Sequence, residues 1–150
     1  MNRRDFSALL PLVAAASALA PEAVAQTATP PAHLDKLVSG QYPPQPPKLP
    51  PTAPRVGRSY LVGMLPDNIR LEAHQTHLAP GAPPEPIGHH KHSEIWLMHE
   101  GEATLMTNGV TRTLKTGDMG LCVAGDAHTI TNASQSEPAS YFVVTVGPPE

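Results

Sequence analysis

Short strand-like runs separated by turn residues recur between residues 59 and 146, and their spacing restricts the fold more than any other feature of the chain. The clearest turn is Asn108-Gly109, because both residues tolerate the positive φ of a type I′ hairpin turn. The chain also contains nineteen prolines and eleven glycines, and no helical pattern follows residue 25. The sequence therefore predicts an all-β domain, either a sandwich or a barrel.

About eight strands are expected at this spacing. They span residues 59–65, 69–78, 94–98, 103–107, 110–114, 119–123, 128–131 and 141–146. With 150 residues and 40% hydrophobic residues, the chain has room for one modest domain. Its net charge of -3 and its lack of basic runs argue against nucleic acid or anionic lipid as partners.

The first 25 residues have the pattern of an export signal. Arg3 and Arg4 precede an apolar stretch from residue 8 to residue 20, and Ala23-Val24-Ala25 supplies a small-x-small cleavage site. The stretch is shorter than the roughly 20 residues that a membrane-spanning helix needs. It resembles a twin-arginine signal, so we expect a periplasmic or secreted protein that leaves the membrane after signal cleavage.

A proline-rich segment separates the signal from the β domain. Residues 26–54 hold nine prolines and little apolar periodicity, which predicts an extended arm or linker. Packing on its own domain or on a partner subunit is the main expectation, and a proline-rich recognition ligand is the alternative. The β domain is expected at residues 55–150. Its single cysteine, Cys122, lies in an apolar run, where a buried inert thiol is expected rather than a nucleophile.

Histidines and a glutamate cluster just before the third expected strand. His90, His92 and Glu94 stand at i, i+2 and i+4, so a continuous strand over residues 87–98 would project them to one face. On such a strand Trp96 and Met98 would continue that face as an apolar surround. Imidazole and carboxylate donors suit iron, manganese, nickel, copper or zinc. A mononuclear divalent metal site is therefore predicted, with solvated surface histidines as the competing interpretation.

The other candidate residues are less specific. His89 has the opposite parity and would turn inward only if a bulge or loop intervenes. His74, His77 and Tyr60 are candidates for an additional acid–base group. Arg70 and Arg112 could bind a substrate carboxylate, but both lie in alternating strands where a solvent-facing arginine is expected. No catalytic residue is assigned.

Two motifs resemble those of the cupin superfamily. The interval from Glu94 to Gly101 reproduces the end of the first cupin motif. Gly117, Gly125, His128 and Asn132 reproduce the spacing of the second motif. Together the two motifs place most of the mature domain within the resemblance, over roughly residues 60–146.

The chain departs from the cupin pattern at two places. Only Ser93 separates His92 from Glu94, whereas the family interval would make His90 the second histidine of its pair and place the first at Gly88. Val123 replaces the usual proline of the second motif, which is expected to alter a turn. His90, Glu94 and His128 are ligands under either alignment, and the strand argument favours His92 over His89 as the fourth.

The resemblance implies a fold and a range of functions. The expected fold is a single-domain double-stranded β-helix, also called a jelly-roll barrel, with a small-molecule pocket and often a metal. The leading interpretation is a metal-dependent dioxygenase that acts on a small organic substrate. A non-catalytic ligand-binding protein and a metal-dependent isomerase or lyase are the alternatives, since fold alone does not fix function. Family members commonly dimerise, so a homodimer is among the expected assemblies.

The export prediction can be tested without reference to the fold. Replacing both arginines, Arg3→Lys with Arg4→Lys, should hold the precursor in the cytoplasm, because the twin-arginine route recognises the paired guanidinium groups. Cell fractionation with immunoblotting measures the outcome, and the unaltered precursor is the control. Normal export of the double variant would indicate the general secretory route instead.

Overall fold

The computed structural model describes residues 33–149 and contains eight β-strands in that range. The predicted signal and the first part of the proline-rich segment therefore lie outside the described residues. The strands are β1 (Arg55–Leu65), β2 (Ile69–Leu78), β3 (Ser93–Glu100), β4 (Glu102–Thr107), β5 (Val110–Lys115), β6 (Met119–Cys122), β7 (His128–Asn132) and β8 (Ala139–Gly147). One 3-10 turn, η1 (Pro66–Asn68), joins β1 to β2. The all-β prediction is confirmed.

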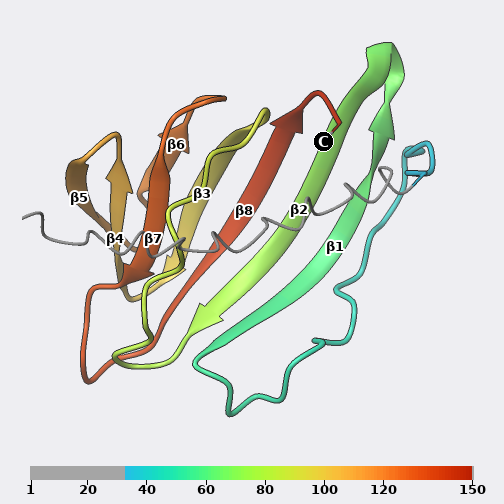
Figure 1. Cartoon of the computed structure of the whole chain (residues 1–150). Helices are drawn as coiled ribbons and strands as arrows, with labels where there is room; N and C mark the ends of the chain where they lie inside the picture. Colours follow the sequence, from blue (N-terminus) through green and yellow to red (C-terminus); the bar gives the residue numbers. More distant parts are fainter. Residues whose placement is uncertain (1–32, 150) are drawn as a thin grey trace, which may run out of the picture.

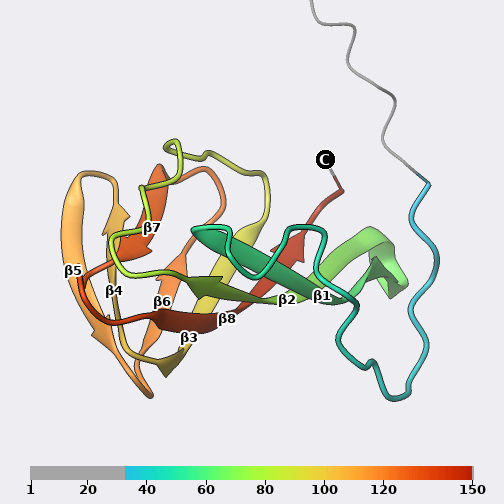
Figure 2. The ribbon, with the colours of Figure 1, turned by 90° about the horizontal axis from the view of Figure 1, so that it is seen from below.

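The strands form two antiparallel sheets that lie face to face (Figures 1 and 2). The larger sheet has the order β1-β2-β8-β3-β6, and the smaller has the order β5-β4-β7. A buried apolar cluster lies between them and includes Leu78, Trp96, Met98, Leu105, Leu114, Ile130, Tyr141 and Val143. A Cβ at Gly120 on β6 would come within 2.7 Å of Leu105 and 2.8 Å of Leu114, so this glycine lets the smaller sheet pack closely.

The hairpin predicted at Asn108-Gly109 is confirmed. The two residues have φ values of 47° and 79°, and they connect β4 to β5.

Residues 87–98 do not form one continuous strand, which is the arrangement that would project His90, His92 and Glu94 to one face, because β3 begins only at Ser93. Upstream of β3 the backbone pairs elsewhere. The N–H of Gly88 donates to the carbonyl of His128 at 2.8 Å, and the carbonyl of His90 accepts from the N–H of Gly125 at 2.8 Å. From Ser93 onward the chain pairs with β8, and from Glu94 with β6 as well. The chain bends at residues 91–92 to satisfy both sets of partners.

The described part of the proline-rich segment runs along the outer edge of β1 (Figure 1). Its backbone is held by bonds from Leu37 N–H to the Met64 carbonyl at 2.9 Å and from Gln45 N–H to the Ser59 carbonyl at 2.8 Å. These bonds occupy polar groups that an edge strand would otherwise expose to another chain. Within residues 33–149, no helix has the length and apolar character needed to cross a membrane.

Arg55 closes one end of the space between the sheets. Its guanidinium donates to the hydroxyl of Tyr141 at 2.7 Å and to the carbonyl of Ile130 at 3.0 Å, and it forms an ion pair with Glu85 at 2.9 Å. This one side chain therefore ties β1 to β8, to β7 and to the loop before β3. Tyr141 is 1% exposed, and burial raises its pKa to about 12.

The raised pKa predicts a loss of stability at alkaline pH. The folded protein favours neutral Tyr141. The contribution of this residue to the free energy of unfolding is therefore complete below the ordinary pKa of 10.0, and it disappears as pH rises towards about 12. Two pKa units correspond to about 3 kcal/mol. The free energy of unfolding of the wild type, measured in urea, should therefore fall between about pH 9 and about pH 11.5. It should fall more than that of Tyr141→Phe, which has no ionisable hydroxyl at this position. Equal losses in both proteins would contradict the prediction.

Candidate metal centre

The register of three neighbouring strands brings polar side chains to one end of the space between the sheets. β8 lies between β2 and β3, and Thr145 on β8 pairs with Glu72 on one side and with Glu94 on the other. Paired residues in antiparallel strands share a face, so these three side chains project together. Further along the same face the residues become apolar, with Leu78, Trp96 and Met98 in the core. The polar side chains therefore lie next to the apolar core on the same face of the sheet.

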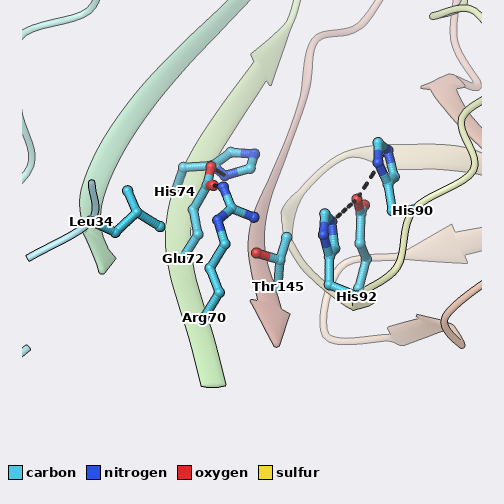
Figure 3. Close-up of a pocket in the computed structure, with 8 residues that line it drawn as sticks. Leu34, Arg70, Glu72, His74, His90, His92 and Thr145 are labelled. Atoms are coloured by element: carbon cyan, nitrogen blue, oxygen red, sulfur yellow. Dashed lines mark hydrogen bonds and ion pairs between the residues drawn. The ribbon is translucent and has the colours of Figure 1, made fainter. Parts of the chain in front are cut away.

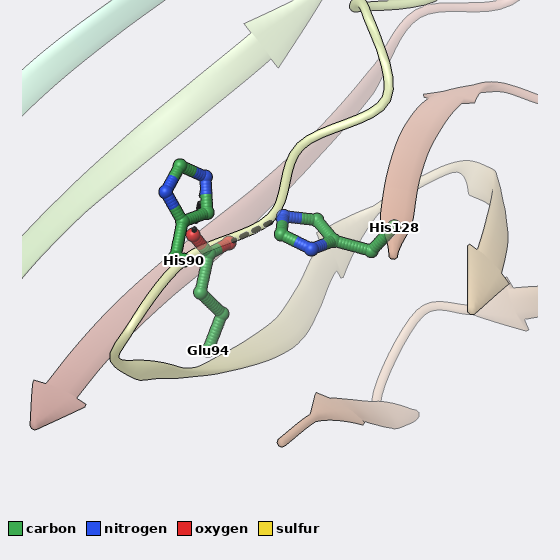
Figure 4. Close-up of side chains that lie close together, drawn as sticks. All are labelled: His90, Glu94 and His128. Carbon is green, nitrogen blue, oxygen red and sulfur yellow. Dashed lines mark ion pairs between the residues drawn. The ribbon is translucent and has the colours of Figure 1, made fainter. Parts of the chain in front are cut away.

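His90, Glu94 and His128 form the centre of the candidate site (Figure 4). One donor atom from each can be chosen so that all lie within 4.8 Å of one another. Nε2 of His90 is 3.7 Å from Glu94 Oε1, and Nε2 of His128 is 3.5 Å from Glu94 Oε2. The Glu94 side chain is 13% exposed, so its charge needs compensation by these neighbours or by a cation.

His92 joins this group from the bend before β3. Its Nε2 lies 3.2 Å from Glu94 Oε1, and its ring stacks on that of His90 with centroids 4.7 Å apart. A Cβ at Gly147 would lie 2.6 Å from the Cα of His92, so the missing side chain on β8 allows the bend to pack against that strand. His92 is 7% exposed, whereas His89 is exposed.

Gly88 occupies the position where the cupin interval would place a first histidine. A Cβ added to Gly88 would lie 3.0 Å from Nε2 of His90 and 3.3 Å from Nε2 of His128. The position therefore faces the candidate site, although it carries no donor. His92 instead approaches Glu94 from the bend at residues 91–92. The interval between His92 and Glu94 is shorter than in the cupin pattern, and the backbone before β3 bends where a regular strand would continue.

The ring of His128 is oriented by groups on the side away from Glu94. Nδ1 lies 3.4 Å from the carbonyl oxygen of Asp126 and 3.5 Å from Sγ of Cys122. A proton on Nδ1 would be donated to that carbonyl, which leaves Nε2 as the donor atom facing Glu94. Cys122 itself is buried, and burial raises the pKa of its thiol. The expectation of a buried thiol is confirmed, and its raised pKa disfavours the nucleophilic thiolate.

A cavity of about 430 Å³ opens beside the candidate metal donors. It is lined by His90, His92 and Glu94 on one side and by Arg70, Glu72 and His74 of β2 on the other (Figure 3). A second space of about 200 Å³ shares His74, His90 and Glu94 with the first and extends towards Trp96 and His128. His74 therefore stands where the two spaces meet.

Of the three candidate acid–base groups, only His74 lies beside the candidate metal donors. His74 lines the cavity, while His77 is exposed. Tyr60 packs against Phe142, with ring centroids 6.0 Å apart; Phe142 alternates with buried Tyr141 and Val143, so this contact lies outside the core.

The solvent-facing orientation expected for Arg70 is wrong. Its side chain is 19% exposed, lines the cavity and forms an ion pair with Glu72, because β2 turns the face of residues 70, 72 and 74 inward. Arg112 on β5 is exposed, as expected. Glu72 and Thr145 were missed by the sequence reasoning, although Arg70-x-Glu72-x-His74 already shows the two-residue period of a strand face.

Comparisons with known proteins agree with this architecture. Residues 74–145 match the cupin domain family. No curated protein matches the chain. An RmlC-like cupin from Shewanella frigidimarina superimposes with a TM-score of 0.54 at 16% identity, covering 71% of this chain and 84% of its own. A Cupin 2 conserved barrel domain protein from Salinispora arenicola gives a TM-score of 0.52 at 23% identity, with 65% and 80% covered.

A third structure, a predicted oxalate decarboxylase from Thermotoga maritima, gives a TM-score of 0.50 at 20% identity and covers 61% of this chain and 79% of its own. At these identities the likeness establishes the fold, and the jelly-roll prediction is confirmed. The match of residues 74–145 to the cupin domain family agrees with the fold that the two antiparallel sheets and these structural neighbours share.

Proposed function

We propose that His90, His92, Glu94 and His128 bind one divalent transition metal. The observation that carries this proposal is the convergence of donor atoms from His90, Glu94 and His128 within 4.8 Å. His92 extends the set, since its Nε2 lies 3.2 Å from Glu94. Imidazole nitrogen with one carboxylate fits iron, manganese, nickel, copper or zinc, and it fits magnesium or calcium poorly because those ions prefer oxygen ligands.

We propose a metal-dependent oxygenase acting on a small organic molecule as the leading activity. A metal held by these residues would supply a Lewis acid and positions open to substrate and dioxygen. The cavity of about 430 Å³ has the size of a small-molecule site, and its lining mixes charged, polar and apolar groups. A metal-dependent isomerase or lyase is the second candidate, favoured by the orientation of His74 into the cavity.

Export by a twin-arginine route and homodimerisation stay predictions from the sequence.

The proposed donors predict a pattern of metal loss. His90→Ala, His92→Ala and His128→Ala should each lower metal occupancy, because each removes a nitrogen donor close to Glu94. His89→Ala is the matched control, since His89 is an exposed neighbour. Elemental analysis after identical reconstitution measures occupancy, and circular dichroism checks that the sheets persist. Stoichiometric metal in both His90→Ala and His128→Ala would contradict the proposal, whereas equal retention in His92→Ala and His89→Ala would leave three protein ligands.

Oxygen consumption tests the leading activity. Protein purified without added metal is analysed for its metal and then assayed with diols, diketones and phenols for oxygen uptake and substrate loss. We expect the two rates to agree, and Glu94→Gln to lower both at least about tenfold because it removes the charged donor. Substrate conversion without oxygen uptake would indicate an isomerase or lyase. Saturable binding without conversion, in metal-loaded protein, would indicate a ligand-binding protein.

A further inference from the structure

The wall of the cavity opposite the proposed metal donors has its own ordered set of charged groups. Arg70, Glu72 and His74 occupy alternate positions on β2 and therefore share its inward face. Figure 3 shows them rising from β2 on one side of the cavity, with His90 and His92 on the other side. None of the three belongs to the proposed metal donors.

Glu72 connects the other two members of this row. One carboxylate oxygen forms an ion pair with Nη2 of Arg70, and the other lies 3.2 Å from Nδ1 of His74. The contact with His74 lowers the pKa of Glu72 most, and the positive charge of Arg70 lowers it further, although burial opposes both. Glu72 is therefore a carboxylate at neutral pH.

The position of Glu72 favours one tautomer of the neutral His74 ring. A carboxylate facing Nδ1 favours a proton on that nitrogen, which leaves the lone pair on Nε2. At 3.2 Å the two atoms are within ion-pair distance, but Nδ1 of His74 makes no aligned hydrogen bond with the residues that the structure describes. Catalytic contacts of this kind are often poorly aligned without ligand and tighten when substrate binds. The side chain of His74 is 27% exposed and borders both parts of the cavity, so a small ligand can reach its ring.

Thr145 provides independent evidence that a polar ligand fits between the walls. It is 4% exposed, lines the cavity, and pairs across the sheet with both Glu72 and Glu94. Its buried hydroxyl has no hydrogen-bond partner among the residues that the structure describes. Leaving such a group unsatisfied costs about 1–3 kcal/mol, so an oxygen atom of a bound ligand would relieve that cost.

We propose that His74 accepts the proton of an enol, phenol or diol hydroxyl bound between the two walls, with Glu72 and Arg70 as positioning residues. The substrate O–H bond breaks and an N–H bond forms at Nε2, while the electron pair stays on the substrate oxygen. The resulting imidazolium lies next to the Glu72 carboxylate, which stabilises its charge. This proposal rests on the proposed function, because the substrate is placed beside the metal donors.

Any probe bound in the cavity also senses the other ionisable groups around it. Those that line the two spaces together with Arg70, Glu72 and His74 are Glu85, His90, His92, Glu94, His128 and Tyr141. Because they are identical in the variants compared, a difference between a His74 variant and its control reports on His74.

A chromophoric phenol tests proton acceptance directly. Protein loaded with zinc, which is redox-silent, is mixed with 4-nitrocatechol, whose ionised form absorbs at longer wavelength, and the apparent pKa of the bound probe is measured. In His74→Gln the ratio of ionised to neutral probe should fall at least about tenfold, which is one pKa unit. His77→Gln is the matched control, because His77 is an exposed histidine on the same strand and should leave the ratio unchanged.

The outcomes separate this inference from the metal proposal. Equal ratios in zinc-loaded His74→Gln and His77→Gln would overturn the role of His74, as would loss of zinc from His74→Gln alone. Wild-type protein that holds zinc but does not bind the probe would overturn the proposed substrate class. Failure of the wild type to hold any metal would instead overturn the proposed function.

The positioning role of Glu72 has a readout that needs no metal. Nitrogen-15 NMR of the imidazole rings in metal-free protein should show His74 protonated at Nδ1 in the wild type, and a shift towards the Nε2-protonated form in Glu72→Gln. An unchanged tautomer in Glu72→Gln, in a variant that melts like the wild type, would contradict that role.

Discussion

The pairing register of β2, β8 and β3 is the constraint on which the rest of the site depends. It sets Glu72, Thr145 and Glu94 side by side, and it sets Leu78, Trp96, Met98 and Tyr141 on the same inward face further along the strands. Because side chains alternate between faces, a slip of one residue would expose the apolar set and the polar set together. Burial of the apolar set therefore fixes the position of the polar residues, without any need for them to attract one another.

This arrangement also explains how charged groups can be held between the sheets. Glu94 and Glu72 are both largely shielded from water, and an isolated carboxylate in such a place is costly. Each carboxylate has nitrogen partners: imidazoles around Glu94, and Arg70 with His74 beside Glu72. The two clusters lie on opposite walls of one cavity, so a ligand between them meets two different sets of donors and acceptors.

Much of the fold was predictable, because strands and turns depend on local chemistry. The Asn108-Gly109 turn and the alternation along β2 and β3 required only neighbouring residues. The bend before β3 was not predictable in this way, since it arises from the pairing of Gly88 with His128, forty residues apart.

The inward orientation of Arg70 was missed for a similar reason. Alternation shows which residues share a face, but the pairing of β2 with β8 decides which face points inward. The same limit applied to His74, His77 and Tyr60. By contrast, the sequence predicted that His90, Glu94 and His128 lie together, because histidine and glutamate stood at motif spacings, and the structure brings their donor atoms within 4.8 Å of one another. Thr145 offered no such signal, since its significance comes only from the strands on either side.

The described part of the proline-rich segment contributes to the wall of the cavity. Leu34 lines the same cavity as Arg70 and Glu72, while the backbone just after it is held against β1 through Asp35 and Leu37. The cavity wall is therefore formed in part by a segment that supplies none of the proposed metal donors. Selectivity for ligand size could change by substitution in this segment alone, while the chemistry at the far side of the cavity stayed as it is.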